Sequence, residues 1–265
     1  MERLDRLFDI AFVRPPSDSY VNCVSTNPGK NDIDVTLARQ QHRNYASILK
    51  ESGIEVIELP TLAAYPDSVF MQDPALLGSR RSIIGRFGEA TRRGEAKALM
   101  NDLAGHGAEV GALKIVNEPG TLEGGDVMVT DRGIFVGESK RTNSSGIKQL
   151  AAHLTDSQVK PVKTNLMHLL CGCSYLSKGA IIIAPELINP DSFPSFRFVE
   201  IPGEDALAAD ELYLGEDKVL IPSGFPRTVA KLRDAGYKPI EIEISEFHKG
   251  DGGVTCLSSP VYKLF

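Results

Sequence analysis

The sequence predicts an α/β fold built from five repeated units that can close into a ring. A pattern of two short strands, a helix and a further strand recurs along the 265 residues. Asp73, Glu123 and His168 follow one another at about 45 to 50 residues, each at the start of a strand pair in successive units. No Ser-, Gly- or Pro-rich tract divides the chain, so we expect a single domain spanning residues 1–265.

Each unit is marked by short apolar runs, a turn between two of them, and usually a helix of amphipathic period. The first unit has a buried strand at residues 9–14, a helix at 34–51 and an alternating strand at 54–59. The other predicted elements are strands 74–77 and 82–85 with helix 91–103, strands 126–129 and 134–137 with helix 144–154, strands 173–176 and 180–184, and strands 211–214 and 219–221 with helix 226–235.

Composition and charge favour a folded protein that acts on small molecules. Apolar residues make up 42% of the chain, charged residues 24%, and the formal net charge is −6. Lys and Arg form no basic run, which argues against nucleic acid and anionic membranes as partners. The segment Met1–Val13 is charged, and no apolar run approaches the roughly 18 residues of a membrane span. We expect a cytoplasmic protein, with monomer and homodimer both open.

The cysteines are too few and too unevenly spaced for a disulfide framework. They are Cys23, Cys171, Cys173 and Cys256, and we expect all four to be reduced. The pair around Gly172 invites a metal interpretation, but no second pair of Cys or His residues lies nearby to complete a zinc site. Buried structural thiols explain this pair better, and we expect no metal and no cofactor.

Two glycine-rich turns and a histidine between them carry the strongest chemical signal. Cys256 ends the run Asp251–Cys256, Glu123 lies within Gly120–Asp126, and His168 lies between them. A thiol becomes a useful nucleophile only as the thiolate, so it needs a proton carrier such as histidine. A carboxylate is the usual group that orients that histidine. Cys256, His168 and Glu123 can therefore supply the three roles of a catalytic triad.

The same residues allow simpler interpretations. Cys256 could be a small buried side chain, His168 a core histidine, and the turn after Glu123 an ordinary turn. The glycines before Cys256 suit a close approach of backbone to a ligand. The residues Ser258–Pro260 make a core strand after it improbable, so we expect Cys256 beyond the last strand. The turn after Glu123 is too short for a phosphate-binding loop, which argues against a nucleotide.

The order of motifs along the whole chain resembles the dimethylarginine dimethylaminohydrolase family. This resemblance implies the fold of the guanidino-modifying enzymes, a five-bladed α/β propeller of ββαβ units with pseudo-fivefold symmetry, which agrees with the five units above. The motifs are Val35–Pro60, Pro66–Phe70, Arg92–Glu95, Gly120–Val127, Phe135–Gly137 with Ser139–Asn143, His168-Leu169 and Asp251–Cys256.

The resemblance implies the catalytic roles. Cys256 would attack the guanidinium carbon, and His168 would protonate the departing amine and then activate water. Glu123 would orient His168 and help to polarise the substrate. A covalent thiouronium intermediate would divide a difficult hydrolysis into two easier steps.

The resemblance also implies the substrate-binding residues. Asp73 would bind the guanidinium nitrogens, and Arg92 and Arg141 would hold the substrate carboxylate, since a planar guanidinium fork suits that anion. Asp67 would hold the α-amino end. Gln72 stands where the family usually has an acidic residue, and we expect it to contact the substrate and alter selectivity.

The implied activity is hydrolysis of asymmetric dimethylarginine to citrulline and dimethylamine. Leu170 stands where related arginine deiminases carry an aspartate, which favours an alkylated arginine over arginine. Arginine or citrulline hydrolysis stays open because of Gln72. Two other classes also stay open: a non-catalytic binder, like the ribosome anti-association factors that resemble this fold, and thiol acyl transfer or peptide hydrolysis. The polar segment from Pro15 to Asp32 is a candidate cover for the pocket.

Overall fold

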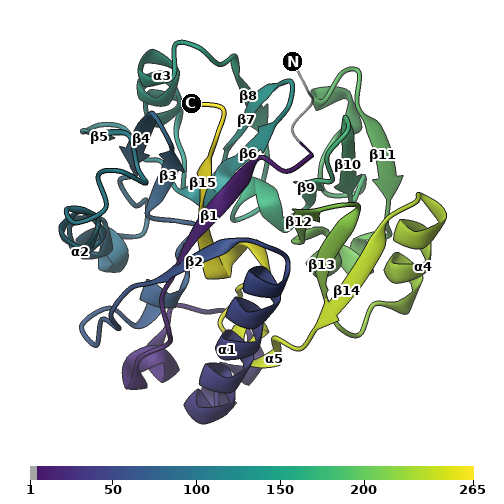
Figure 1. Cartoon of the computed structure of the whole chain (residues 1–265), viewed down its shortest axis with the longest axis horizontal. Coiled ribbons are helices and arrows are strands. Elements are labelled where there is room, and N and C mark those ends of the chain that lie inside the picture. The colour runs from purple at the N-terminus through teal and green to yellow at the C-terminus, as the bar shows by residue number, and fades with distance from the viewer. Residues whose placement is uncertain (1–4) are drawn as a thin grey trace.

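A computed structural model describes residues 5–265 as a mixed α/β fold whose strands form four sheets (Figure 1). Glu2 and Arg3 of the charged N-terminal segment lie outside the described residues. One sheet has the strand order β2-β1-β15-β3-β4-β5, and the others have the orders β6-β7-β8, β11-β10-β9 and β12-β13-β14. The strands are β1 (Phe8–Val13), β2 (Glu55–Glu58), β3 (Ala75–Gly78), β4 (Arg81–Ile84), β5 (Ala112–Ile115), β6 (Val127–Thr130), β7 (Gly133–Glu138), β8 (Val159–Lys163), β9 (Cys173–Tyr175), β10 (Ala180–Ile183), β11 (Arg197–Glu200), β12 (Leu212–Gly215), β13 (Lys218–Pro222), β14 (Lys238–Ile242) and β15 (Ser258–Tyr262).

The strands repeat one topology five times. In each group an antiparallel pair is followed by a strand parallel to the second member, as in β6-β7-β8. The first group is completed from the far end of the chain, because β15 pairs antiparallel with β1, which pairs parallel with β2. The five units predicted from the sequence are therefore present. We number these groups one to five, beginning with β15-β1-β2 and following the chain.

Helices make the crossover to the parallel strand in four of the five groups. They are α1 (Val35–Glu51), α2 (Arg93–Leu103), α3 (Ser144–His153) and α4 (Pro226–Asp234), and a short α5 (Ser245–His248) follows the fifth group. The fourth group departs from the predicted ββαβ pattern, since only a 3-10 turn (Pro190–Ser192) lies between β10 and β11. That connection contains Pro185, Pro190 and Pro194, which remove the backbone donors that a helix needs.

Helix α1 shows how local sequence sets an element. The carboxylate of Asp34 accepts hydrogen bonds from the backbone N–H groups of Thr36 (2.8 Å) and Leu37 (3.1 Å), and so caps the helix N-terminus. Tyr45 and Leu49, one turn apart, are fully buried. Capping and one apolar face together explain the predicted helix, which begins one residue after the expected start.

The apolar core is divided among five clusters, each of which joins two groups. Leu220 of the fifth group packs in one cluster with Val13 of the first, and Phe12 of the first packs in another with Leu77 of the second. Three further clusters join the second group to the third, the third to the fourth, and the fourth to the fifth. Figure 1 shows the groups around the middle of the molecule, with helices α1 to α4 on the outside.

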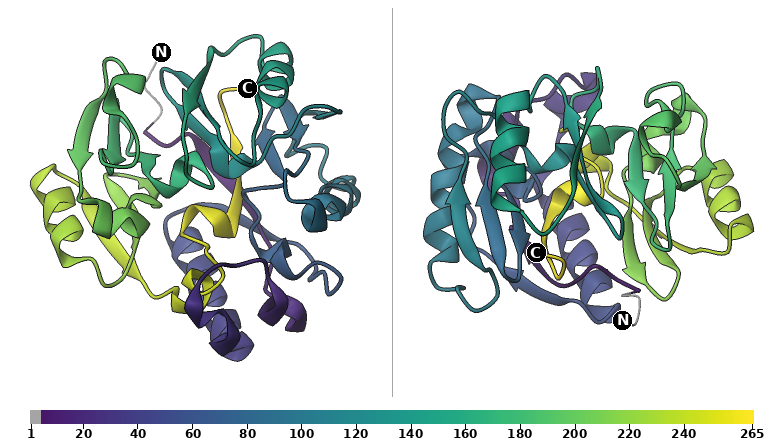
Figure 2. Two further views of the ribbon diagram at one scale, coloured as in Figure 1. Left: turned by 180° about the vertical axis from the view of Figure 1, so that it is seen from behind. Right: turned by 90° about the horizontal axis from the view of Figure 1, so that it is seen from above.

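The C-terminal strand contradicts one sequence prediction. Residues Ser258–Tyr262 form β15, which lies between β1 and β3 and runs through the middle of the molecule (Figure 2). Pro260 is compatible with this place because it pairs with Ala11 of β1, whereas pairing with β3 begins only at Val261. Cys256 therefore precedes the last strand instead of following it.

Two expectations from composition can be compared with the fold. All four cysteines are free, which agrees with the expectation of reduced thiols. None of the helices among residues 5–265 has the length and apolarity that crossing a bilayer requires.

Candidate active site

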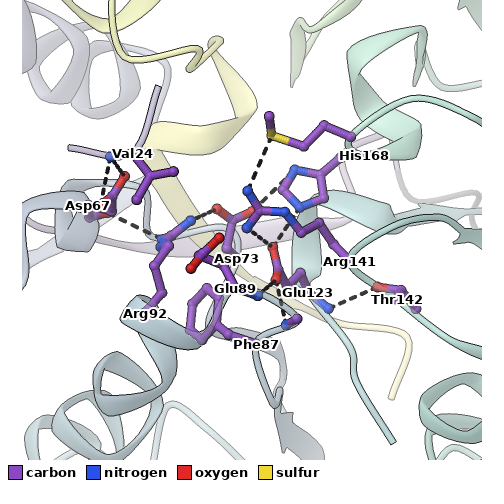
Figure 3. Close-up of polar contacts among 12 residues, drawn as sticks. Val24, Asp67, Asp73, Phe87, Glu89, Arg92, Glu123, Arg141, Thr142 and His168 are labelled. Atoms are coloured by element: carbon purple, nitrogen blue, oxygen red, sulfur yellow. Dashed lines mark hydrogen bonds and ion pairs between the residues drawn. The ribbon is translucent and has the colours of Figure 1, made fainter. Parts of the chain in front are cut away.

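One pocket brings together six of the eight residues predicted to form the site. Its wall contains Asp67, Asp73, Arg92, Arg141, His168 and Cys256, and it also contains Val24, Phe70, Met167, Gly250, Asp251 and Gly252. Glu123 lies behind this wall, wholly buried, and contacts His168. Figure 3 shows Asp73, Glu123, Arg141 and His168 converging from different elements.

His168 is held by Glu123. The Nε2 of His168 lies 2.8 Å from Oε2 of Glu123, and the other oxygen of Glu123 accepts the backbone N–H of Gly88 at 2.8 Å. The backbone N–H of Glu123 is fixed in turn by the Thr142 hydroxyl at 3.0 Å. This arrangement leaves Nδ1 of His168 as the nitrogen directed to the pocket side, toward Asp73 (Figure 3).

The charges around His168 favour its protonated form. Burial disfavours the imidazolium, but the carboxylates of Asp73, Glu123 and Asp126 outweigh it and raise the pKa of His168 to about 9. Burial likewise opposes ionisation of Glu123, yet the hydrogen bond and charge of His168 hold the pKa of that carboxyl well below its ordinary range. At neutral pH the pair is therefore an imidazolium and a carboxylate.

Asp73 offers a free acceptor to the pocket. Its Oδ2 binds Nη1 of Arg92 at 2.6 Å, while its Oδ1 has no hydrogen-bond partner among residues 5–265 and lies 3.8 Å from Nδ1 of His168. Gly125 makes this approach of the two side chains possible: a Cβ there would lie 2.6 Å from Nδ1 of His168 and 2.8 Å from Oδ1 of Asp73. The free oxygen suits an N–H donor of a cationic ligand.

The two arginines of the pocket differ in how far their donors are engaged. Arg92 binds both oxygens of Glu95 (3.0 and 2.9 Å) as well as Asp73, and its guanidinium lies 4.5 Å from the centre of the Phe87 ring. Arg141 has only long contacts, 3.5 Å to Glu123 and 3.9 Å to the sulfur of Met167. Arg141 is thus better able to bind a ligand anion, and the role predicted for Arg92 stays a prediction.

Asp67 connects the pocket to the segment predicted as a cover. Both of its carboxylate oxygens accept the backbone N–H of Val24, at 3.0 and 3.2 Å. The backbone N–H of Thr26 donates to Asp251 at 2.7 Å. Val24 and Thr26 of the segment 15–32 therefore lie against the pocket, and the movement of this segment as a lid stays a prediction.

Cys256 lies in a 3-10 turn (Thr255–Leu257) just before β15. Its Sγ is 3.7 Å from Oδ2 of Asp210, whose Oδ1 accepts the backbone N–H of Thr255 at 2.8 Å. Burial raises the pKa of the Cys256 thiol well above its ordinary value, and the carboxylates of Asp210 and Asp73 add to that rise. At neutral pH the unliganded site therefore holds a thiol.

Asp210 is a site residue that sequence reasoning missed, although a signal for it exists. Asp73, Glu123, His168, Asp210 and Cys256 follow at intervals of 50, 45, 42 and 46 residues. Each of them lies shortly before the first strand of an antiparallel pair, in one of the five groups. Extending the repeat one step beyond His168 would have located Asp210.

Gln72 does not lie where we expected it. It lines a second cavity, together with Leu170, Glu211 and Thr255, and is not part of the wall that carries Cys256. Its side-chain amide donates to the backbone carbonyl of Gly124 at 3.3 Å, which holds the side chain in that direction. This geometry does not support the prediction that Gln72 contacts the substrate.

The pocket also has a donor set that could accommodate a metal ion. One ligand atom from each of Asp73, Glu123 and His168 lies within 4.8 Å of the others. However, Arg92 and Arg141 already pair with the two carboxylates, and His168 is bound to Glu123. These contacts suit orientation of a histidine, and the absence of a metal stays an expectation.

The mixed α/β fold and this pocket define a class of protein. A thiol, an imidazolium held by a carboxylate, and a free carboxylate oxygen are the groups that a hydrolase of cationic amidines would use. A sequence profile described as "N,N dimethylarginine dimethylhydrolase, eukaryotic" matches residues 16–192. A dimethylarginine dimethylaminohydrolase of Pseudomonas aeruginosa is 35% identical over 258 residues, which cover 95% of this chain and 99% of that protein. The chain belongs to the dimethylarginine dimethylaminohydrolase family.

Further relatives and solved structures agree with this membership. A dimethylarginine dimethylaminohydrolase of Streptomyces coelicolor is 33% identical over 259 residues, covering 96% of this chain and 98% of that protein. The solved P. aeruginosa enzyme, a cysteine-to-serine variant complexed with citrulline, has a TM-score of 0.87 at 33% identity, covering 96% of this chain and 99% of that one. The N-terminal domain of ArgZ, a cyanobacterial arginine dihydrolase, has a TM-score of 0.86 at 21% identity, covering 96% and 98%, and shows the shared fold.

Proposed function

We propose that this protein hydrolyses asymmetric dimethylarginine to L-citrulline and dimethylamine. The observation that carries the proposal is that Cys256, His168 and the free oxygen of Asp73 meet in one pocket, with Glu123 holding His168. The P. aeruginosa relative is named for this activity and was solved with citrulline. The family is one of hydrolases, and the substrate is our inference from the pocket.

The charges of the pocket fit a substrate that has a cation at one end and an amino acid group at the other. Oδ1 of Asp73 would bind a guanidinium N–H and hold the guanidinium carbon near Sγ of Cys256. Arg141 would bind the α-carboxylate, with Arg92 assisting through its remaining N–H. Asp67, which already accepts the backbone N–H of Val24, would face the α-amino group.

In this mechanism Cys256 attacks the guanidinium carbon and forms a covalent thiouronium intermediate. His168 donates its proton to the departing dimethylamine, since an amine leaves poorly without one. Neutral His168 then takes a proton from water, which attacks the same carbon and releases citrulline. The imidazolium state of His168 in the unliganded site supports its role as the initial acid.

We also propose that the five strand groups form a closed five-bladed propeller. Two observations support it. The apolar clusters join each group to the next and the fifth back to the first. The five residues from Asp73 to Cys256 occupy one repeated position, which a radial arrangement would bring to a common axis.

The test is to incubate the purified protein separately with asymmetric dimethylarginine, arginine and citrulline. Mass spectrometry would follow dimethylamine, ammonia, citrulline and ornithine. Dimethylamine with citrulline is the expected result. Ammonia from arginine, or ornithine from citrulline, would show another member of the guanidino-hydrolase class, and no product from any would indicate a binding protein.

Cysteine dependence is tested by Cys256→Ser, which should keep the fold and abolish turnover, because a serine hydroxyl is a far weaker nucleophile at neutral pH. The matched control is Cys173→Ser, which alters a buried thiol outside the pocket and should retain activity. Turnover by Cys256→Ser at the wild-type rate would reject the covalent mechanism.

A further inference from the structure

We propose that Asp210 and Cys256 share one proton, which rests on sulfur in the free protein and passes to the Asp210 carboxylate when the cationic substrate enters. This makes Asp210 a further catalytic residue, since it contacts the reacting sulfur. The proposal rests on the proposed function of the pocket. It gives the protein two proton carriers, Asp210 for the thiol and His168 for the amine.

The first observation is the contact itself. Oδ2 of Asp210 is 3.7 Å from Sγ of Cys256, a distance at which a thiol donates to a carboxylate. Oδ1 of the same carboxylate accepts the backbone N–H of Thr255 at 2.8 Å. Gly253 allows this approach, because a Cβ there would lie 2.2 Å from Oδ2 of Asp210. The turn that carries the nucleophile is thus built around Asp210.

The second observation is that His168 is poorly placed to take the thiol proton. Its Nε2 is bound to Glu123 at 2.8 Å, and its Nδ1 lies 3.8 Å from Asp73. No hydrogen bond joins His168 to Cys256 among residues 5–265. Surrounded by carboxylates, the imidazole already carries the proton that the leaving amine needs. A second acceptor is required, and Asp210 is the one in contact with sulfur.

The surroundings of Asp210 make it a better base than an exposed aspartate. Burial raises the pKa of its carboxyl to about 6, against the hydrogen bonds from Thr255 and Cys256 that lower it. The titratable groups that interact with it include Asp73, Cys171, Cys256, Glu211 and Tyr45, which are acids or thiols. The substrate guanidinium adds a positive charge beside the pair, in a pocket whose other cations, His168, Arg92 and Arg141, are already paired with carboxylates.

The proton balance closes without any further reactant. On binding, the S–H proton of Cys256 moves to Asp210, and the sulfur lone pair forms the bond to the guanidinium carbon. His168 gives its proton to the amine as the C–N bond breaks. Water then loses a proton to His168 and adds to the same carbon. When the C–S bond breaks, the electron pair returns to sulfur, which regains its proton from Asp210, and the remaining hydroxyl proton of citrulline leaves to solvent, where the released dimethylamine takes it up as dimethylammonium.

The test compares wild type with Asp210→Asn, which keeps an oxygen for the Thr255 N–H but cannot accept a proton. In wild type the reactive complex has the same number of protons as the free protein. The value of kcat/KM should therefore be independent of pH from about pH 6 to 8, and it should decrease below about pH 6. In Asp210→Asn the thiol proton must leave to solvent, so kcat/KM should rise about tenfold per pH unit over that range. The control Glu211→Gln removes the neighbouring buried carboxyl and should keep the level profile.

A readout independent of turnover is alkylation of Cys256 by iodoacetamide, which reacts with the thiolate. Removal of the Asp210 charge should lower the thiol pKa and raise the alkylation rate at pH 7.5 by about tenfold for each unit of pKa lowered. Unchanged alkylation with a level kcat/KM profile in Asp210→Asn would overturn the proposal. If wild type turned over no substrate, the proposed function would be rejected. The alkylation rates would still show whether the Asp210 carboxylate acts on the Cys256 thiol. If Asp210→Asn did not fold, a wild-type kcat/KM that rises through pH 6 to 8 would overturn the proposal.

Discussion

Nε2 of His168 lies 2.8 Å from Oε2 of Glu123, a carboxylate without solvent exposure whose other oxygen is held by the backbone of Gly88. Because this carboxylate is fixed from behind, it determines both the direction of the imidazole and the proton it carries. The pair joins a buried carboxylate to an imidazole in the pocket wall. Its protonation state should appear in the pH dependence of kcat and of the free energy of unfolding.

Glu123→Gln should lower the pKa of His168 and so reduce the fraction of imidazolium. The pKa of His168, about 9 in the intact site, falls when the carboxylate is removed, so the alkaline limb of kcat should move from about pH 9 to lower pH. At pH 8 we expect kcat to fall by about 100-fold, the scale of lost general acid catalysis. The measurement is kcat against pH with Glu118→Gln as the control, since Glu118 is exposed. An alkaline limb that stayed at pH 9 would contradict this assignment.

The same imidazolium should stabilise the fold in a pH-dependent way. Its folded-state pKa is raised above the unfolded value of 6.5, so its contribution is fully present below pH 6.5 and is lost as pH rises through about 9. Between these limits the free energy of unfolding of wild type should fall by about 3 kcal/mol more than that of His168→Gln. Urea unfolding of both proteins at pH 6 and pH 9.5 measures it. Equal losses in the two proteins would show that His168 is not charged in the native state.

Gly125→Ala should disable the site with little effect on the rest of the fold. The added methyl group would lie within 3 Å of both His168 and Asp73, so one of these side chains must move. A displacement of about 1 Å is enough to lower kcat by about 100-fold. Gly105→Ala is the control, because no atom lies within 4 Å of a Cβ at that position. Wild-type kcat in Gly125→Ala would place the reacting atoms elsewhere.

Arg141→Met should raise KM through loss of the substrate carboxylate contact. A charge-assisted pair contributes about 1.5 to 3 kcal/mol, so kcat/KM should fall by about 10- to 150-fold. A dimethylguanidine substrate without the carboxylate should react equally with Arg141→Met and wild type, because it cannot make that contact. Arg233→Met on α4 is the exposed control. If kcat/KM fell equally for both substrates in Arg141→Met, Arg141 would act on the reacting centre instead of on the carboxylate.

The sequence predicted most of the inner strands and all four crossover helices, because apolar period and turn residues mark them. The pocket residues Asp67, Arg92 and Arg141 were indicated by the family resemblance. Among the outer strands, β2 was predicted as the alternating strand 54–59, but β5, β8, β11 and β14 were not located. All four residues of β5 are exposed and β8 buries only Val162 fully, so neither has the apolar alternation that identifies a strand. The strand β15 was missed because Pro260 is tolerated only through its pairing partners, which the sequence does not display.

For the site, residue type and motif order indicated Cys256, His168 and Glu123, but they could not show which cavity each side chain faces. Gln72 and Asp73 are neighbours in the chain and line different cavities. Asp210 lies in no recognisable motif, and its contact with Cys256 depends on how two distant groups pack. Such relationships are set by tertiary structure, which the local pattern does not contain.

The repeated position from Asp73 to Cys256 gives this architecture an unusual division of labour. The backbone is modular, but the five modules supply three carboxylates, one imidazole and one thiol, each at a different place in the site. A chain missing one strand group would lose one of these five side chains and also two of the five apolar clusters that join neighbouring groups. Under the proposed function, turnover would require all five strand groups at once, so loss of any one group would abolish activity instead of reducing it by a fifth.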